Sequence, residues 1–280
     1  MATVDILIPT YNRSAALAVT LTSLIAQTYK DFRVIISDQT ESVDANGECQ
    51  GAFAAGEVQA ALRVLHSVLG SNPDAIQTHQ HLPRRGIAEQ RQFLLDQATA
   101  PYALFLDDDL ILEPFVVQQL LTTIQEEECG FVGSGMIGLS FSDDVRPHEQ
   151  AIEFWDRSVQ PESICPGMPQ WERWKLHNAA NLYHIQRNFN LNPKQPRTYR
   201  VAWVAGCVLY DVAKIRSVGG FSFWHDLPEN HCGEDVLVQQ RIMARHGGCG
   251  VLPSGVYHQE LKTTIPDRSN NAPVMLPLAT

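Results

Sequence analysis

Three consecutive carboxylates, Asp107, Asp108 and Asp109, follow directly on the apolar run of residues 102–106. That run predicts a buried strand, so the three acids stand side by side at a strand end, where they repel one another. No run of Lys or Arg lies nearby in the sequence to offset them. A bound divalent cation is the simplest way to offset this repulsion. Mg²⁺ and Mn²⁺ take one or two protein carboxylates and complete their coordination shell with phosphate oxygens and water. The alternative is a solvated acidic turn before a helix near Pro114.

A second acidic pair, Glu234 and Asp235, follows Gly233 and begins a segment whose apolar residues recur at helical spacing. Both acids therefore occupy the first turn of a predicted helix, where the helix dipole favours the carboxylate form. On the residues alone, they complement this dipole, which is the usual role of acids in a first turn.

The elements that position these acids begin with a βαβ unit. Residues 4–8 are apolar and end at Pro9, which is typical of a strand buried on both faces of a parallel sheet. Ser14 can cap a helix, and a second buried strand at 32–37 ends at Asp38. Because ligands bind beyond the carboxyl ends of parallel strands, the loops at Pro9 and Asp38 are candidate binding loops.

The rest of the chain carries the same kinds of pattern, with one irregular region. The spacing predicts helices at 51–62, 86–98, from Pro114, at 212–218 and from Glu234, and strands at 63–66, 102–106, 130–137, 201–210 and 250–257. We expect residues 138–200, which are rich in Pro, Asn, Gln and aromatic residues, to form an irregular insert. Its tryptophans, which are Trp155, Trp171 and Trp174, and Trp203 after it either stack on a ligand or anchor the insert. We expect a mobile tail from about Pro266.

Composition excludes several classes of function. The chain has 280 residues, of which 44% are hydrophobic and 19% charged, as in a folded globule. Its net charge of −10 argues against nucleic-acid binding, which needs clustered Lys and Arg. No apolar run approaches the roughly 20 residues of a membrane span, and six cysteines without a CxxC pair suggest no zinc module. We expect an unexported, cytoplasmic protein, either free or peripheral at the inner membrane surface.

Six short motifs resemble those of the family 2 glycosyltransferases of the GT-A fold, and they occur in that family's order between Val4 and His258. They are Pro9-Thr10-Tyr11-Asn12-Arg13, Gln27-Thr28-Tyr29, Arg91 in its helix, Leu106-Asp107-Asp108-Asp109, Val218-Gly219-Gly220-Phe221 and Gly233-Glu234-Asp235. The resemblance implies an α/β fold with a Rossmann-like, mostly parallel central sheet flanked by helices. It also implies one domain over 1–265, with a nucleotide-sugar half at 1–137, an acceptor half at 138–265 and a tail at 266–280.

The resemblance also implies roles for individual residues. Mn²⁺ or Mg²⁺ would be held by Asp109 and Asp107, with His258 completing the metal site. The residues implied to contact the donor are Pro9, Thr10, Tyr11, Arg13, Asp38, Arg91, Asp107 and Asp108. Asp235 is implied as the general base, and Glu234 as a contact to an acceptor hydroxyl or as the base in its place.

Several of these assignments keep a structural alternative. Asp38 can accept a hydrogen bond from an imide N–H such as that of uracil, which favours a uridine nucleotide, or it can be a turn residue. Arg13 and Arg91 suit a diphosphate, or they are surface charges. His258 is alternatively structural. Gln92 follows Arg91 where the family usually has Asn, which is a departure from the pattern.

The function that the resemblance implies is metal-assisted, inverting transfer of a sugar from a nucleotide-diphospho-sugar, preferably a UDP-sugar, to a hydroxyl of a glycan, a lipid-linked or another acceptor. One alternative is a sugar-phosphate nucleotidyltransferase, which usually carries a Gly-rich basic loop after its first strand, where this chain has Pro9 to Arg13. A phosphatase with an Asp nucleophile would leave that loop and Gly233-Glu234-Asp235 unexplained. A non-catalytic nucleotide-sugar or glycan-binding module would differ in lacking transfer activity that depends on Asp235.

Overall fold

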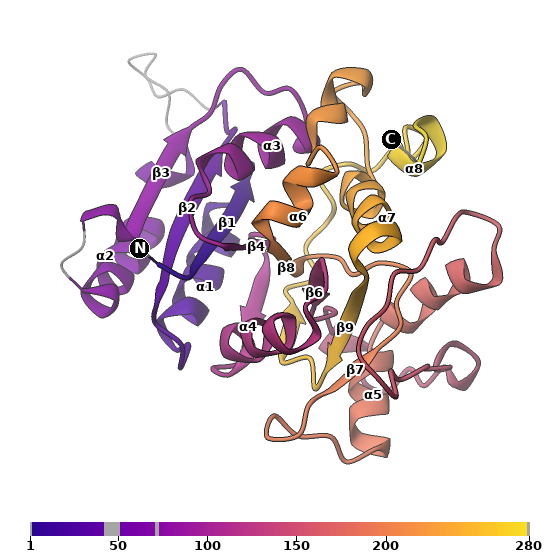
Figure 1. Ribbon diagram of the computed structural model, residues 1–280. Helices are drawn as coiled ribbons and strands as arrows, with labels where there is room; N and C mark the ends of the chain where they lie inside the picture. Colours follow the sequence, from indigo (N-terminus) through magenta and orange to yellow (C-terminus); the bar gives the residue numbers. More distant parts are fainter. Residues whose placement is uncertain (1, 42–50, 71–72, 279–280) are drawn as a thin grey trace.

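The computed structural model describes residues 2–41, 51–70 and 73–278 of the chain. Its centre is an eight-stranded sheet in the order β3-β2-β1-β4-β8-β6-β9-β7, with helices on both faces (Figure 1). Strands β1 to β4 run parallel, whereas β8 pairs antiparallel with both β4 and β6. The expected α/β class with a mostly parallel central sheet is confirmed.

The elements of the first half alternate as the βαβ pattern predicts. Its strands are β1 (Val4–Thr10), β2 (Phe32–Asp38), β3 (Ile76–Gln80), β4 (Tyr102–Leu106), β5 (Leu110–Leu112) and β6 (Phe131–Gly133). Its helices are α1 (Ser14–Ile25), α2 (Gly56–Leu69), α3 (Ile87–Gln97) and α4 (Val116–Glu127).

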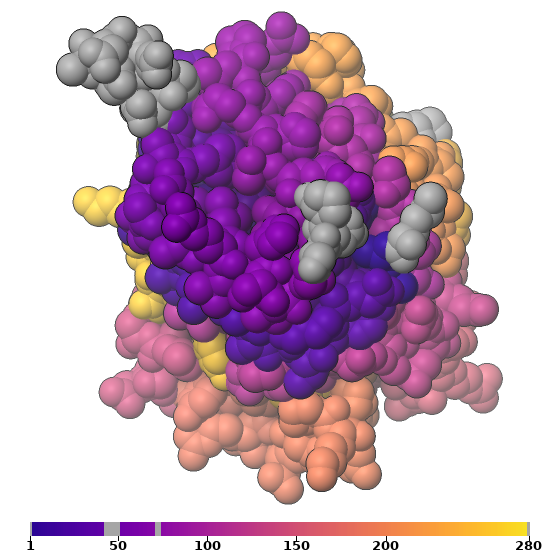
Figure 2. All heavy atoms as spheres, turned by 90° about the vertical axis from the view of Figure 1, so that its left-hand side faces the viewer, coloured from indigo at the N-terminus to yellow at the C-terminus, as the bar shows by residue number. Residues whose placement is uncertain are grey.

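The second half contributes strands to the same sheet. These are β7 (Arg197–Tyr199), β8 (Cys207–Asp211), β9 (Gly248–Leu252) and β10 (Val256–His258). The helices are α5 (Asn181–Asn188), α6 (Val212–Ser217), α7 (Glu234–His246) and α8 (Ala272–Met275), and a 3₁₀ segment, η5, covers Pro169–His177. The segment around α5 lies below the sheet in Figure 1, and residues near 200 form the lower end of the molecule in the turned view of Figure 2.

The core lies on both faces of the sheet, because successive residues of a buried strand point to opposite sides. In β1, Ile6 and Ile8 pack with α1, α2 and α4, whereas Leu7 packs with α3, α6 and α7. All three side chains are fully buried. The interpretation of residues 4–8 as a strand buried on both faces is therefore confirmed.

A small second sheet joins the end of β4 to the late part of the chain. Strand β10 pairs antiparallel with β5, and His258 stands opposite Leu110 in the register. The next residue, Gln259, donates its backbone N–H to the carbonyl of Asp109 at 2.9 Å. This pairing brings His258 to the acidic motif although the two are 149 positions apart (258 − 109).

Some expected elements differ in the structure. Residues 63–66, expected as a strand, belong to α2, whose buried Val58, Ala61 and Leu65 recur at helical spacing. The strand expected at 130–137 is shorter, and the one expected at 250–257 is divided between β9 and β10. The strand is interrupted at Pro253, because proline has no backbone N–H to donate to a neighbouring strand.

Residues 270–277, within the segment expected as a mobile tail, make defined contacts with the domain. The N–H of Cys232 donates to the carbonyl of Asn270, and the N–H of Ala272 donates to that of Cys232. Ala272 is fully buried in the core cluster of α7, and Arg241 donates to the carbonyl of Pro277. The sequence pattern does not predict this packing, because the few apolar residues of the segment show no steady period. Within the described ranges, none of the helices is long and apolar enough to cross a membrane.

Candidate active site

A cavity of about 370 Å³ lies where the carboxyl ends of β1 and β4 meet the N-terminus of α7. All the residues predicted for donor, metal or catalytic roles line it except Asp38. They are Pro9, Thr10, Tyr11, Arg13, Arg91, Asp107, Asp108, Asp109, Glu234, Asp235 and His258. The fold therefore brings four of the six motifs, together with His258, to one cavity.

Arg91, on α3, joins the two acidic motifs in the cavity wall. Its Nε donates to Glu234 Oε1 at 3.0 Å and its Nη2 donates to Asp107 Oδ1 at 2.9 Å. Arg91 is only 7% exposed. Burial alone would lower the pKa of its guanidinium, but Asp107 and Glu234 outweigh burial and raise that pKa. Arg91 is therefore a charged bridge between protein carboxylates, a role that the sequence did not predict.

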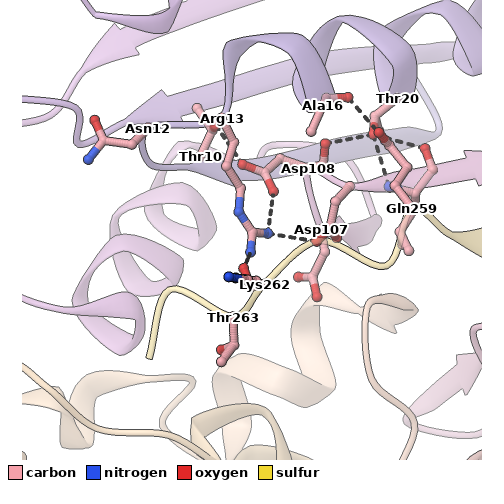
Figure 3. A network of polar contacts seen from close by, with 12 residues as sticks. Thr10, Asn12, Arg13, Ala16, Thr20, Asp107, Asp108, Gln259, Lys262 and Thr263 are labelled. Carbon is pink, nitrogen blue, oxygen red and sulfur yellow. Dashed lines mark hydrogen bonds and ion pairs between the residues drawn. The ribbon is translucent and has the colours of Figure 1, made fainter. Parts of the chain in front are cut away.

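Arg13 makes a second cationic bridge, between the first loop and the other two aspartates (Figure 3). Its Nη1 donates to Asp109 Oδ2 at 2.6 Å and lies 3.3 Å from Asp108 Oδ1, while its Nη2 donates to the carbonyl of Lys262 at 2.5 Å. Asp108 also accepts a 2.6 Å hydrogen bond from the Thr10 hydroxyl. Burial raises the pKa of Asp108 to about 7. Asp108 thus ties the end of β4 to the first loop.

Asp109 and His258 have the spacing of two ligands on one cation. His258 Nε2 lies 3.3 Å from Asp109 Oδ2, and two ligands at right angles with bonds of about 2.1 Å stand about 3 Å apart. The hydrogen bond that His258 donates to Asp109 raises the pKa of His258, although burial opposes it. Burial acts to raise the pKa of Asp109, but His258 and Arg13 outweigh burial and lower it.

This donor set fits a cation that takes its remaining ligands from outside the protein. In the part of the chain that the structure describes, no group of three or more His, Cys, Asp or Glu side chains is arranged to hold a metal. Mg²⁺ and Mn²⁺ need no third protein ligand when phosphate oxygens and water complete the shell. Asp107, the other expected ligand, is bonded to Arg91 through Oδ1 and is exposed on its other side, with 32% of its side chain accessible.

Glu234 and Asp235 stand in the first turn of α7, as the sequence predicts. Burial raises the pKa of Glu234, against the charge of Arg91. Burial and the neighbouring Glu234 raise the pKa of Asp235 to about 7, again against Arg91. Gly233 precedes them in the left-handed region with φ of 76°, and a Cβ there would lie 2.4 Å from Asn271 Oδ1. Only Gly permits this approach of the C-terminal segment to the start of α7.

Asp38 does not line the cavity. It is fully buried, and its Oδ1 and Oδ2 accept backbone N–H groups of Thr40 at 2.9 Å and Ala52 at 2.5 Å. These are the contacts of a turn residue, which was the alternative from the sequence. Asp38 does pair in register with Thr10 of the neighbouring strand, and Thr10 lines the cavity.

The cavity also has walls that the sequence patterns did not single out. Gln90 donates its side-chain amide to the carbonyls of Thr10 and Ser37 and so ties the ends of β1 and β2 together. Further lining residues come from the loop before β8 and from the segment after β10: Ala205, Leu261, Thr263, Thr264, Ile265 and Arg268. Gln90 directly precedes Arg91 in α3, and this position next to a motif residue is the feature of the sequence that could have marked it. The apolar and Thr residues carry no charge or motif that would have marked them.

Comparisons with known proteins bear on the family and on the fold. The model of the family described as glycosyl transferase family 2 matches residues 5–188. The crystal structure of residues 1–349 of TarS from S. aureus has a TM-score of 0.51 at 15% identity, covering 91% of this chain and 60% of that chain. Its complex with UDP-GlcNAc scores 0.50 at 13% identity, covering 94% and 60%.

A third solved structure is the mannosyltransferase PcManGT from Pyrobaculum calidifontis in complex with GDP-Man and Mn²⁺. It has a TM-score of 0.49 at 13% identity and covers 96% of this chain and 59% of that one. The present chain thus spans about 60% of the length of these structures. The TarS likeness shows a shared fold. The comparison with curated proteins finds no match.

The raised pKa of Asp235 makes a prediction about stability. A carboxyl whose pKa is about 7 when folded and about 3.9 when unfolded destabilises the fold increasingly from about pH 4 to pH 7, and by a constant amount above. Asp235→Asn should therefore stabilise the protein at pH 8 by up to about 4 kcal/mol and leave stability nearly unchanged at pH 4. Urea unfolding of both proteins at several pH values measures this difference. Loss of stability at pH 8 would instead assign the carboxylate a structural role.

Proposed function

The chain belongs to glycosyl transferase family 2, and from this premise we propose that its cavity transfers a sugar from a nucleotide-diphospho-sugar to an acceptor hydroxyl. The observation that carries the proposal is the meeting of Asp109 and His258 with Glu234 and Asp235 around one cavity. The first pair suits a cation at a diphosphate, and the second pair supplies a buried proton acceptor. A single displacement with inversion needs these two elements and no nucleophilic side chain.

On the donor side, Asp109 and His258 would hold Mn²⁺ or Mg²⁺. When bound, such a cation stabilises the charge that develops on the departing nucleoside diphosphate. Arg13 Nη1 donates to the same Asp109 Oδ2 that faces His258, so Asp109 and His258 would hold the cation at an oxygen that Arg13 now occupies. The planar, bidentate guanidinium of Arg13 would then be available to donate to the diphosphate.

On the acceptor side, Asp235 removes the proton of the attacking hydroxyl. A pKa of about 7 suits a general base at neutral pH, because about half of the molecules then carry the carboxylate and that carboxylate is basic enough to take a proton. Arg91 keeps Glu234 paired at 3.0 Å, which leaves Asp235 as the acid without an ion pair to that guanidinium among the described contacts. Glu234 is thereby a positioning residue, and Asp235 carries the base role.

We keep uridine as the preferred nucleobase and Asp38 as its selector. Asp38 stands one strand away from Thr10 in register, and a carboxylate has about four lone-pair sites, of which two accept backbone N–H groups here. The sheet thus holds Asp38 beside the first loop, and because its side chain is fully buried, a nucleobase would have to take the place of one of these backbone N–H groups. A structure of the same fold in complex with UDP-GlcNAc is consistent with this preference.

The metal-bridge proposal predicts how nucleotide binding depends on the cation. UDP titrated by calorimetry should bind in the presence of Mn²⁺ and lose at least about tenfold in affinity in chelator, because the bridge contributes several kcal/mol. Asp109→Asn should lose the Mn²⁺ dependence. Asp108→Asn is the matched control, since its carboxylate faces Thr10, and it should keep the dependence. Equal UDP affinity with and without metal would exclude the bridge.

The uridine proposal predicts a preference in the same titration. With Mn²⁺ present, UDP should bind several-fold more tightly than ADP or GDP, since a hydrogen bond to a charged acceptor contributes about 1.5–3 kcal/mol. Asp38→Asn should reduce this preference without changing the Mn²⁺ dependence. A preference for GDP in the wild-type protein, or an unaltered preference in the variant, would remove Asp38 from nucleobase selection.

The base assignment predicts a specific kinetic defect. Asp235→Asn keeps the size and the hydrogen-bonding shape of the side chain but not its basicity, so UDP and metal affinity should survive while transfer falls by about 10²- to 10⁴-fold. The wild-type rate should rise with pH through about 7, and this rise should vanish in the variant.

Glu234→Gln is measured beside it under the same conditions. A larger catalytic loss in this variant, with Asp235→Asn active, would move the base to Glu234. Full binding with no transfer in the wild-type protein would favour a nucleotide-sugar-binding module.

A further inference from the structure

Three tryptophans gather beside the cavity without belonging to it. Trp171 and Trp174 lie in η5, and Trp203 lies in the loop before β8. The ring centroids of Trp171 and Trp203 are 4.9 Å apart, and those of Trp174 and Trp203 are 6.4 Å apart with the rings nearly parallel at 13°. Trp203 is thus in the middle of the group.

The backbone around Trp203 is held from both sides by α7 and η5. Gln239 exchanges two hydrogen bonds with the backbone of Val204, at 2.8 and 2.7 Å, and Gln240 donates to the carbonyl of Ala202. His177 hydrogen-bonds the backbone of Trp203 itself. Since Gln239 is one helical turn after Asp235, these bonds fix Trp203 relative to the proposed base.

The three tryptophans differ in how they pack. Trp171 packs against the core cluster that contains α7, whereas Trp174 and Trp203 belong to neither core cluster. Both are only partly buried. Part of the surface of each ring is therefore accessible to a ligand, although Trp174 and Trp203 also lie nearly parallel to each other. Ala205, two residues after Trp203 and therefore within about 7 Å along the chain, lines the cavity next to Asp235.

We propose that Trp203, supported by Trp174, is the stacking surface for a pyranose ring of a carbohydrate acceptor. The inference rests on the proposed function and adds the class of acceptor. A pyranose has one apolar face of C–H groups that covers an aromatic ring and hydroxyls at its rim that can reach Asp235. The acidic cavity disfavours anionic acceptors, so the sugar is neutral. An acyclic polyol carries the same hydroxyls but has no ring face.

The test is saturation-transfer NMR on the whole protein with Mn²⁺ and UDP. The probes are methyl β-D-glucopyranoside and methyl β-D-galactopyranoside, with glucitol as the acyclic comparison. We expect transfer to ring protons of a glycoside in the wild-type protein and in Trp203→Phe, a 3- to 10-fold weaker effect in Trp203→Leu, and little transfer to glucitol. Trp174→Leu is a second variant with a smaller loss in the same direction.

Trp155→Leu is the matched control, because Trp155 packs against the other core cluster with the Arg200 guanidinium 3.6 Å from its ring centroid. It should keep the wild-type signal. The UDP signal in the same sample reports the donor site, so its loss would count against the proposed function alone. With UDP bound, absence of any glycoside signal, an unchanged signal in Trp203→Leu, or equal transfer to glucitol would overturn the stacking surface.

Discussion

The buried guanidinium of Arg91 is the contact on which the site depends. It comes from α3 and holds Asp107 at the end of β4 and Glu234 at the start of α7, so three elements meet at one charge. Removing one partner of such a buried pair is strongly destabilising, by about 3–5 kcal/mol, because it leaves an uncompensated charge. The acidic motifs can therefore be buried together only because Arg91 lies between them. Its engagement with protein carboxylates also explains why it is fixed in the wall and does not reach across the cavity.

The two arginines of the site have different tasks. Arg91 is buried and paired on both sides, whereas Arg13 lies at the mouth and also donates to the carbonyl of Lys262 in the segment after β10. A chain with a net charge of −10 attracts a diphosphate only if local cations overcome the general repulsion. Here the carboxylates of the motif already have cationic partners. Under the proposed function, a cation and a diphosphate would take over the present partners of Asp109 and Arg13, so both charges would keep a partner of opposite sign.

Much of this arrangement could be predicted from the sequence, and the limits have physical causes. Strand-terminal acids and buried strands are local patterns, so the strands at 4–8 and 102–106 and the helix beginning at Glu234 were predicted where the structure has them. Whether a charged side chain binds a ligand or another side chain depends on contacts between distant segments. For that reason the sequence could not show that Arg91 bridges two motifs, or that Asp38 accepts hydrogen bonds from the backbone of Thr40 and of the more distant Ala52. The irregular residues 138–200 carry no period, and their packing around Trp203 follows from single glutamines of α7.

The C-terminal segment positions the start of α7, although its sequence carries no periodic pattern. A first-turn acid at a helix N-terminus is normally favoured as a carboxylate, yet Asp235 has a raised pKa because burial outweighs the helix dipole. Residues 270–273 lie next to the acidic pair of α7, because Asn270 and Ala272 bond to the backbone of Cys232 and a Cβ at Gly233 would lie 2.4 Å from Asn271 Oδ1. The packing of a few small residues therefore fixes the backbone that leads into α7, although no charged side chain lies among them.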